Sequence, residues 1–380
     1  MVDLPFCVLP WFHQVVNTDG DIRPCCIWRS STNELDTKRF LYSEFMHNLR
    51  DQFKQGIPHA ECSQCTYEES NNNLSIRQSG FDTLHTLNIN FEELETTQKF
   101  NILSQDVRLS NVCNLKCRMC GQTRSTNWIT DAVALGEEPI GLLESNWSLS
   151  DDQVLTVSRL RFPGGEPMMH QDVIINEVSK IKDAGRLHLV DLHFTTNMTV
   201  KIESELIALI IGARETSIGC SIDGVSDMND YIRSNSHWCD VVENTNILNT
   251  IHKEHPHVVF GLNPVFNVFN VEEFDKLVDW GQQFNSWIIP SLQHKPMMQD
   301  ARNLPDDYKA DVIERYEICK HEYPLYIDKF NSIISHLKNE RTMEYTMWKR
   351  YLRRHNKFLD KRRHTTLATV NPRLASIIYE

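Results

Sequence analysis

The sequence predicts a parallel α/β sheet, open or curled into a partial barrel, over residues 105 to about 325. Two observations predict it: short apolar runs recur in this region, and amphipathic stretches of helical length separate them. The candidate strands are Asp106–Ser110, Arg159–Phe162, Leu187–Thr195, Ser217–Ile222, Val258–Phe266 and Trp287–Leu292. The candidate helices between them are 171–184, 201–212, 240–253 and 271–284. Functional loops are expected at the carboxyl ends of such strands.

The N-terminal residues 1–70 predict a small, loop-rich unit. Phe6–Val16 is apolar and extended, and a turn sequence at 18–21 joins it to Ile22–Pro24 as a hairpin. A helix is expected near 41–55. Such a unit has little core of its own, so a metal site would stabilise it.

Two further segments complete the predicted organisation. Residues 71–104 are polar and predict a linker with one short helix, Phe91 to Phe100. Residues 301–380 predict a helical C-terminal extension after a barrel over 105–300. Between Lys338 and Arg363 this extension carries ten Lys or Arg against three acids. It is either a solvated helix with an aromatic core side (Tyr345, Trp348, Tyr351 and Phe358) or a surface for an anionic partner.

Composition narrows the function classes. The chain has 380 residues, 41% of them hydrophobic, and a net charge of −12, which argues against general nucleic-acid binding. No apolar run approaches the roughly 20 residues of a membrane span, and the opening Met1–Pro5 lacks the build of a signal peptide. A cytoplasmic protein is therefore expected. Its 11 cysteines then favour thiolate–metal chemistry over disulfides.

Three cysteines, Cys113, Cys117 and Cys120, directly follow the first candidate strand of the sheet. Three thiolates within eight residues can wrap one iron–sulfur cluster and leave one iron free for a small chelating molecule. The alternative is structural zinc, which needs a fourth Cys or His at short spacing. The nearest histidines, His85 and His170, are distant in sequence.

This C-x3-C-x2-C run resembles the signature of the radical S-adenosylmethionine (SAM) superfamily. The resemblance implies a [4Fe–4S] cluster whose open iron chelates SAM. In that family the residue before the last cysteine packs near the adenine, and Met119 stands there as a soft apolar substitute.

The Gly164-Gly165-Glu166 run follows the second candidate strand and resembles the family's GGE motif, which holds the methionine amino group of SAM. Paired glycines also let a ligand approach the backbone closely. The alternative is an ordinary Gly-Gly turn with a surface glutamate.

Later strands end in further polar residues. Asn197 follows the third strand, at the expected mouth of the barrel. Ser221 and Arg233 resemble the S-x-D-G … R pattern of peptide-modifying members, which implies that serine meets the ribose of SAM and arginine its carboxylate. The alternative pairs the arginine with Asp227 or Asp230. Val268 is carried over as an adenine contact after the fifth strand.

A second set of cysteines lies in the N-terminal unit. Cys7 and Cys25, with Gly20 between them, resemble the opening of the SPASM/twitch module in C-x(9–15)-G-x4-C spacing. Cys62 and Cys65 then complete four ligands for one auxiliary [4Fe–4S] cluster, in a permuted position before the barrel. Cys26 adjoins Cys25 and is the alternative ligand, but the spacing from Gly20 favours Cys25. A four-cysteine zinc site is the alternative to the cluster. The isolated Cys220, Cys239 and Cys319 are expected to be buried packing residues.

Together these resemblances imply a partial (β/α)6 TIM-like barrel of the radical SAM type, with a small N-terminal Fe–S module and a C-terminal helical extension. They imply an oxidoreductase or modifying enzyme that cleaves SAM reductively and abstracts hydrogen from a peptide or protein side chain. No catalytic acid or base is identifiable. A nucleotide, cofactor-precursor or sugar substrate, and a non-catalytic Fe–S or zinc protein, are the alternatives. A flavodoxin or ferredoxin is the expected reductant, and no membrane partner is expected.

Overall fold

The computed structural model describes residues 6–70, 74–96 and 100–380. Its contacts divide the chain into two compact units, and each is described by itself. Unit 1 spans Met1–Asn111, Leu142–Thr195 and Ile202–Ser217; unit 2 spans Val112–Gly141, Thr196–Lys201 and Ile218–Glu380. The opening Met1–Pro5 and the end of the expected helix at 97–99 lie outside the described residues. The domain bounds expected from the sequence stay a prediction.

Eight strands belong to one mostly parallel sheet in the order β2-β1-β3-β4-β5-β6-β7-β9, and β8 pairs with β10. The strands are β1 (His13–Val16), β2 (Ile22–Arg23), β3 (Ser104–Val107), β4 (Arg159–Phe162), β5 (Asp191–Thr196), β6 (Glu215–Cys220), β7 (Val258–Leu262), β8 (Val265–Phe266), β9 (Trp287–Ile288) and β10 (Ser291–Leu292). Only the β1–β2 hairpin is antiparallel among the pairings described in register. The predicted parallel α/β class is confirmed, and the described strands do not close into a barrel.

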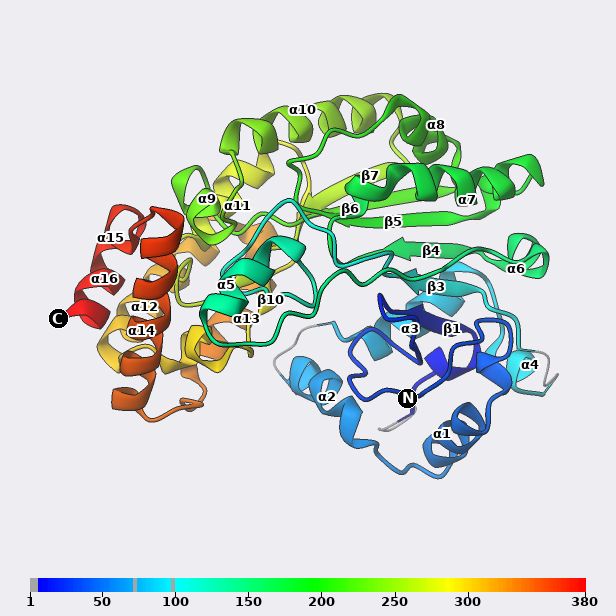
Figure 1. Ribbon diagram of the computed structural model, residues 1–380, viewed down its shortest axis with the longest axis horizontal. Helices are drawn as coiled ribbons and strands as arrows, with labels where there is room; N and C mark the ends of the chain where they lie inside the picture. Colours follow the sequence, from blue (N-terminus) through cyan, green and yellow to red (C-terminus); the bar gives the residue numbers. More distant parts are fainter. Residues whose placement is uncertain (1–5, 71–73, 97–99) are drawn as a thin grey trace. The chain divides into compact units, whose positions relative to one another are not determined.

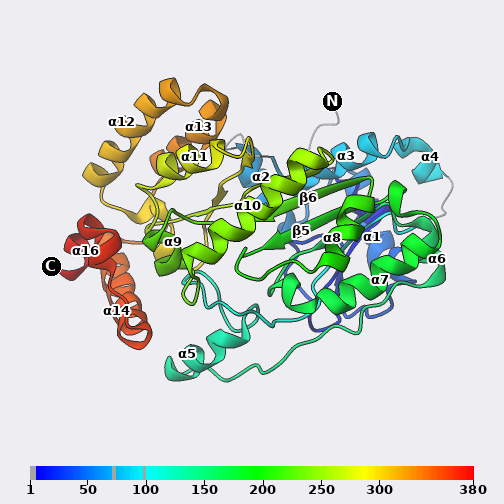
Figure 2. The same ribbon diagram turned by 90° about the horizontal axis from the view of Figure 1, so that it is seen from above.

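The helices of unit 1 are α1 (Glu44–Lys54), α2 (Ser63–Ser70), α3 (Ile76–Thr86), α4 (Phe91–Thr96), α6 (Asp151–Thr156), α7 (Gln171–Asp183) and α8 (Ser204–Gly212). The helices of unit 2 are α5 (Ile129–Ala134), α9 (Asp227–Ile232), α10 (Trp238–Glu254), α11 (Phe274–Gln282), α12 (Asp306–Glu322), α13 (Ile327–Lys338), α14 (Tyr345–Arg363), α15 (Leu367–Val370) and α16 (Pro372–Tyr379). In Figures 1 and 2 α7 and α8 run side by side. Every helix expected between the strands is present.

Several strand bounds differ from the sequence-based expectation. The strand expected at Asp106–Ser110 begins and ends earlier, at Ser104–Val107. The run from Leu187 opens as a 3-10 turn before β5 begins at Asp191. The last two expected strands each break in two, and their second halves form the separate β8–β10 pair. Apolar runs mark these segments well, but hydrogen bonding to a neighbour decides where each strand ends.

The N-terminal segment has a larger core than its sequence suggested. The expected hairpin is present, with a 3-10 turn at Leu9–Trp11, and the helix expected near 41–55 is α1. β1 also pairs in parallel with β3, so the hairpin extends the main sheet. Residues from the expected linker complete the core: Leu84, Leu94, Phe100 and Ile102 pack with Trp11, Phe12, Phe40 and Phe53. The expectation of little core was wrong, because twelve of the sixteen buried residues of this cluster lie within residues 1–70 themselves.

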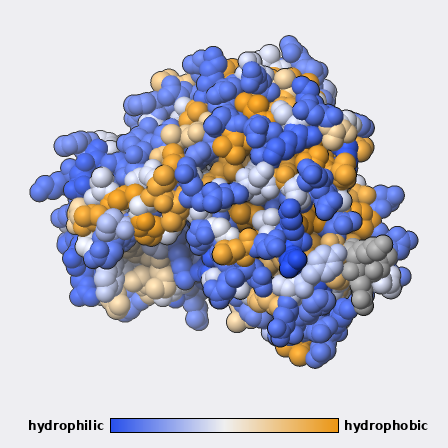
Figure 3. Space-filling view, turned by 45° about the vertical axis from the view of Figure 1, so that its right-hand side comes forward, coloured by the Kyte–Doolittle hydropathy of each residue, from blue (hydrophilic) through white to orange (hydrophobic). Residues whose placement is uncertain are grey.

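In unit 2 the C-terminal helices pack together. Figures 1 and 2 both show α14 beside α16, where Arg353 Nε donates to the carbonyl of Ile378. Trp348 on α14 is fully buried, but Tyr351 is 42% exposed, so the expected aromatic core side holds only in part. No helix in the described part of the chain combines the length and apolarity that a membrane crossing requires. On the face drawn in Figure 3 hydrophilic residues predominate, with hydrophobic ones among them in small groups.

Candidate functional site

The loop of Cys113, Cys117 and Cys120 lies in unit 2, and its backbone is held against the end of α9. Lys116 N donates to the carbonyl of Ser234 at 3.0 Å, and Arg118 N to the carbonyl of Ile232 at 2.8 Å. Side chains that follow the loop in sequence hold its carbonyls. Asn127 Nδ2 donates to Cys113 O at 3.0 Å and Trp128 Nε1 to Cys117 O at 2.7 Å. The three cysteines therefore sit on a backbone fixed from both sides.

Arg118, between the second and third cysteines, is a buried anchor that the sequence did not single out. Its guanidinium donates to Asp360 Oδ1 at 2.6 Å, Asn356 Oδ1 at 2.8 Å and Thr365 Oγ1 at 2.8 Å. It also lies over the ring of Tyr231, 3.7 Å from the ring centroid. Its side chain is 0% exposed. The C-terminal helix α14 thus supplies polar partners that lock the cysteine loop.

A second link between α14 and the cysteine segment uses the basic end of that helix. Arg362 Nε and Arg363 Nε pair with the two carboxylate oxygens of Asp131 on α5, at 2.8 and 3.0 Å. Asp131 is 1% exposed. Part of the positive charge of α14 therefore serves internal packing, and both sequence-based interpretations of its remaining basic residues stay predictions.

Nitrogen donors approach two of the three sulfurs. Asn197 Nδ2 lies 3.9 Å from Cys113 Sγ, and Arg233 Nη1 lies 3.7 Å from Cys117 Sγ. Burial raises the pKa of the Cys117 thiol, and the Arg233 charge opposes that rise. Weak hydrogen bonds and a nearby cation stabilise a thiolate, which is the form that binds iron. Asn197 and Arg233, both predicted site residues, are therefore brought to the cysteines.

Arg233 has an internal partner that the sequence did not identify. Its Nε lies 2.8 Å from Asp223 Oδ2, and both side chains are buried. Burial by itself lowers the pKa of Arg233, but the negative charges of Asp223, Cys117 and Cys120 together outweigh burial and raise it overall. The alternative interpretation correctly expected Arg233 to pair with a carboxylate, but that carboxylate belongs to Asp223 and not to Asp227 or Asp230. Asp223 also accepts from Val265 N at 2.7 Å, so it ties the arginine to the β8 segment.

The remaining predicted contacts in unit 2 have different surroundings. Ser221 is half-buried, and its backbone N donates to Thr196 O at 2.8 Å. Met119 is half-buried within the cysteine loop. Val268 is 0% exposed and donates its N–H to the carbonyl of Gln299, and its contact with an adenine ring stays a prediction.

The predicted Gly164-Gly165-Glu166 motif lies in unit 1, directly after β4. Both glycines have positive φ, +80° and +55°, which side chains with a Cβ rarely adopt. A Cβ on Gly164 would also meet Arg108 Cγ at 3.2 Å. Glu166 is 1% exposed and accepts from Met168 N at 3.1 Å. The turn thus requires glycine at both positions. Its glutamate is buried, contrary to the alternative of a surface residue.

Residues 107–281 match the model of the radical SAM superfamily. The chain contains a radical SAM domain. The matched residues include the cysteine loop, the Gly-Gly-Glu turn, Ser221 and Arg233.

Comparison with other proteins adds fold likeness only. No curated protein matches the chain. Solved structures with likeness include native anSMEcpe with bound AdoMet, at 15% identity, TM-score 0.38, 59% of this chain and 62% of that chain. Native anSMEcpe with bound AdoMet and the Cp18Cys peptide matches at 15% identity, TM-score 0.34, 56% of this chain and 61% of that chain. This chain thus covers less than two thirds of those proteins, and the likeness is too weak to assign a substrate.

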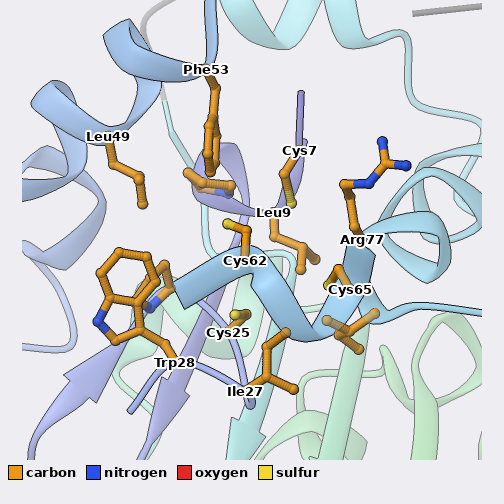
Figure 4. A pocket seen from close by; sticks show the side chains of 13 residues that line it. Cys7, Leu9, Cys25, Ile27, Trp28, Leu49, Phe53, Cys62, Cys65 and Arg77 are labelled. Atoms are coloured by element: carbon orange, nitrogen blue, oxygen red, sulfur yellow. The ribbon is translucent and has the colours of Figure 1, made fainter. Parts of the chain in front are cut away.

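Outside the radical SAM domain, the four N-terminal cysteines line one cavity in unit 1. Cys7 precedes the Leu9–Trp11 turn, Cys25 follows β2, Cys62 ends the 3-10 turn Ala60–Cys62, and Cys65 lies in the first turn of α2. Figure 4 shows their side chains around the same space, with Leu49, Phe53 and Trp28 beside them. Cys26 is absent from this lining, which favours the neighbour Cys25 as the ligand. The chain's fold therefore gathers all four predicted auxiliary ligands.

The environment of these four thiols is apolar. Burial raises the pKa of Cys7 to about 12 and that of Cys62 to about 11, and it raises the pKa of Cys25 well above its ordinary value. A metal centre would reverse this effect, because its positive charge stabilises bound thiolates. The described residues include no group of three or more His, Cys, Asp or Glu arranged to hold a single metal ion.

One expectation about the isolated cysteines was wrong. Cys220 and Cys319 are buried, but Cys239 is exposed near the start of α10. Its burial could not be judged from residue type, because α10 buries only one face, which includes Val241, Leu248 and Ile251.

Proposed function

We propose that this protein is a radical SAM enzyme with an auxiliary [4Fe–4S] cluster that acts on a peptide or protein side chain. The observation that carries the SAM chemistry is the loop of Cys113, Cys117 and Cys120, with Arg233 and Asn197 at its sulfurs, inside the matched radical SAM domain. When bound and reduced, the cluster and SAM supply a 5′-deoxyadenosyl radical that abstracts a hydrogen atom.

The chain's own residues would bind the cluster and SAM and orient them. Three thiolates would hold the cluster and leave one iron to SAM, since no fourth protein ligand lies in the loop. Arg233 offers a guanidinium for a carboxylate while Asp223 fixes its position. The Gly164–Gly165 turn carries no Cβ atoms, so a ligand can approach its backbone closely. Arg118 keeps the loop in place through its buried contacts to α14.

Cys7, Cys25, Cys62 and Cys65 would hold the auxiliary cluster. Their shared cavity and soft donor set suit a closed four-thiolate cluster, which has no place for SAM and is fitted to move an electron. The proposal of a peptide or protein substrate is based on the spacing of Cys7, Gly20 and Cys25, which resembles that of the SPASM/twitch module. We propose a cytoplasmic flavodoxin or ferredoxin as the reductant, because a low-potential cluster needs one.

Anaerobic reconstitution tests the proposed chemistry. With iron and sulfide the protein should take up about eight irons per chain, from two four-iron clusters. Dithionite and SAM should then yield 5′-deoxyadenosine and methionine in equal amounts, measured by liquid chromatography. Iron-loaded protein that leaves SAM intact would contradict the enzyme assignment.

The adjacent cysteines provide a matched pair for the auxiliary site. Replacing Cys25 by alanine should lower the iron content from about eight to about four per chain, because a four-thiolate cluster loses a ligand. Replacing Cys26 should leave it at about eight, since Cys26 lies outside the cavity lining. The measurement is iron by plasma emission together with zinc. Equal iron in both variants, or one zinc in place of four irons, would remove the auxiliary cluster.

A further inference from the structure

Unit 1 contains a second cavity, of ≈ 240 Å³, that no predicted site residue lines. By volume it holds a molecule many times larger than a water. One wall is the sheet, through β1, β3, β4 and β5, and the opposite wall is α3. Its polar lining comprises His13, Ser79, Asp82, Thr83, Thr86, Ser104, Arg159, Arg161 and His193. Asp82 and Thr86 are exposed, so the cavity opens at α3.

The strand register explains why polar residues gather there. His13, Ser104 and Arg159 are direct neighbours across β1, β3 and β4, so their side chains lie on one face of the sheet. Two residues further along, Arg161 of β4 is the direct neighbour of His193 on β5. Because side chains alternate between faces, these five residues all share the face that α3 covers.

Several nitrogens of these side chains have no hydrogen-bond partner within the described structure. They are His13 Nε2, His193 Nε2 and Arg159 Nε. His13 is 3% exposed, and its other nitrogen, Nδ1, lies 3.0 Å from Ser104 Oγ. If the Ser104 hydroxyl donates to Nδ1, Nε2 carries the hydrogen and donates in turn. Buried donors without partners cost stability, so a ligand that accepts from them would be favoured.

The charges around the cavity leave an excess of cations. Arg159 and Arg214 share the carboxylate of Asp191, at 3.1 and 2.7 Å. Arg161 lies 3.7 Å from Asp106, and 38% of its side chain stays accessible although it comes from a central strand. Among the charged side chains that line the cavity, the guanidiniums of Arg159 and Arg161 outnumber the single carboxylate of Asp82, which lies at the exposed rim.

The histidines report the same positive field. Burial lowers the pKa of His193 well below its ordinary value, and Arg161 and Arg159 lower it further. Burial also lowers the pKa of His13. The two arginines lower this pKa further, whereas Asp106 raises it. Neutral imidazoles beside arginines are donors for an anion and poor surroundings for a metal cation.

We propose that this cavity binds the oxyanion of a small molecule, a carboxylate or a phosphate, through Arg161, Arg159, His13 and His193. The cavity volume leaves room for a body attached to the oxyanion. Binding requires neither cluster nor SAM, so the site stands or falls separately from the radical chemistry.

Calorimetric titration of the reconstituted protein with inorganic phosphate, and separately with acetate, tests the proposal. Saturable binding of one of them is expected, and the tighter anion identifies the phosphate or the carboxylate class. Arg161→Gln should weaken that affinity about tenfold, because a charge-assisted hydrogen bond is lost. Asp106→Asn should strengthen it several-fold, because a competing carboxylate is removed. Arg39→Gln, on an 87% exposed side chain of the same unit, should change nothing.

The opposite signs of the two variants separate binding from misfolding, which would weaken both. Nitrogen NMR of labelled histidine in the unaltered protein gives a second measurement, in which the anion should shift the Nε2 signals of His13 and His193. The proposal is overturned if neither anion binds, if Arg161→Gln binds as tightly as the unaltered protein, or if Asp106→Asn also weakens binding.

Discussion

A variant in which Cys113, Cys117 and Cys120 are all alanine should produce no 5′-deoxyadenosine from SAM and dithionite. The reason is local: these thiols are the proposed ligands of the cluster that binds SAM, and the loop offers no replacement sulfur. The cavity of the four N-terminal cysteines is untouched, so the variant should still hold about four irons per chain. Product formation and iron content, measured on the same sample, check both parts.

Cys239→Ala is the matched control for this experiment. Cys239 is exposed on α10, so its removal should leave about eight irons and the full rate of SAM cleavage. Residual SAM cleavage by the triple variant would mean that the loop does not hold the catalytic cluster. Complete loss of iron from the triple variant would instead mean that the auxiliary cluster does not assemble when the loop cluster is absent.

Arg118→Met should destabilise the protein by about 3–5 kcal/mol, the usual cost of removing one partner of a buried ion pair. The guanidinium is 0% exposed, and its loss leaves Asp360, Asn356 and Thr365 without their shared donor. Methionine fills similar space, so most of the cost is electrostatic. Urea unfolding followed by tryptophan fluorescence under anaerobic conditions measures the change in free energy of unfolding.

Two further variants test the cause of that loss. Arg354→Met, on the exposed side of α14, should change the free energy of unfolding by no more than about 0.5 kcal/mol. Adding Asp360→Asn to Arg118→Met should recover part of the loss, because it removes the charge left unpaired. A double variant whose loss of stability equals the sum of the losses in the two single variants would show that Arg118 acts by packing and not through its charge.

Local patterns were sufficient for the elements and for the cysteine loop. Apolar runs and amphipathic stretches predicted β4 at its observed bounds and placed α7, α10 and α11 within a few residues. Cys113, Cys117 and Cys120 are neighbours in sequence, so their spacing alone predicts one ligand set. Where strands end depends on pairing with distant segments, which explains the earlier bounds of β3 and the separate β8–β10 pair.

Partners brought together by packing were beyond local patterns. Asp223 meets Arg233 because the loop after β6 folds back on the segment that follows α9, and an arginine pairs equally well in principle with Asp227 or Asp230. In the sequence, nothing distinguishes Arg118 from the other charged residues of its loop. Its partner Asp360 lies on α14, more than 200 residues later.

The sequence by itself determined the parallel α/β class and the radical SAM ligand spacing, because both depend on residues close together along the chain. Only the tertiary structure decided that Cys25, and not the adjacent Cys26, lines the cavity with Cys7, Cys62 and Cys65. It alone joined His13, Arg161 and His193 on one sheet face beneath α3. Those groupings depend on strand register and on which segments pack together, and long-range packing energy, not local propensity, sets both.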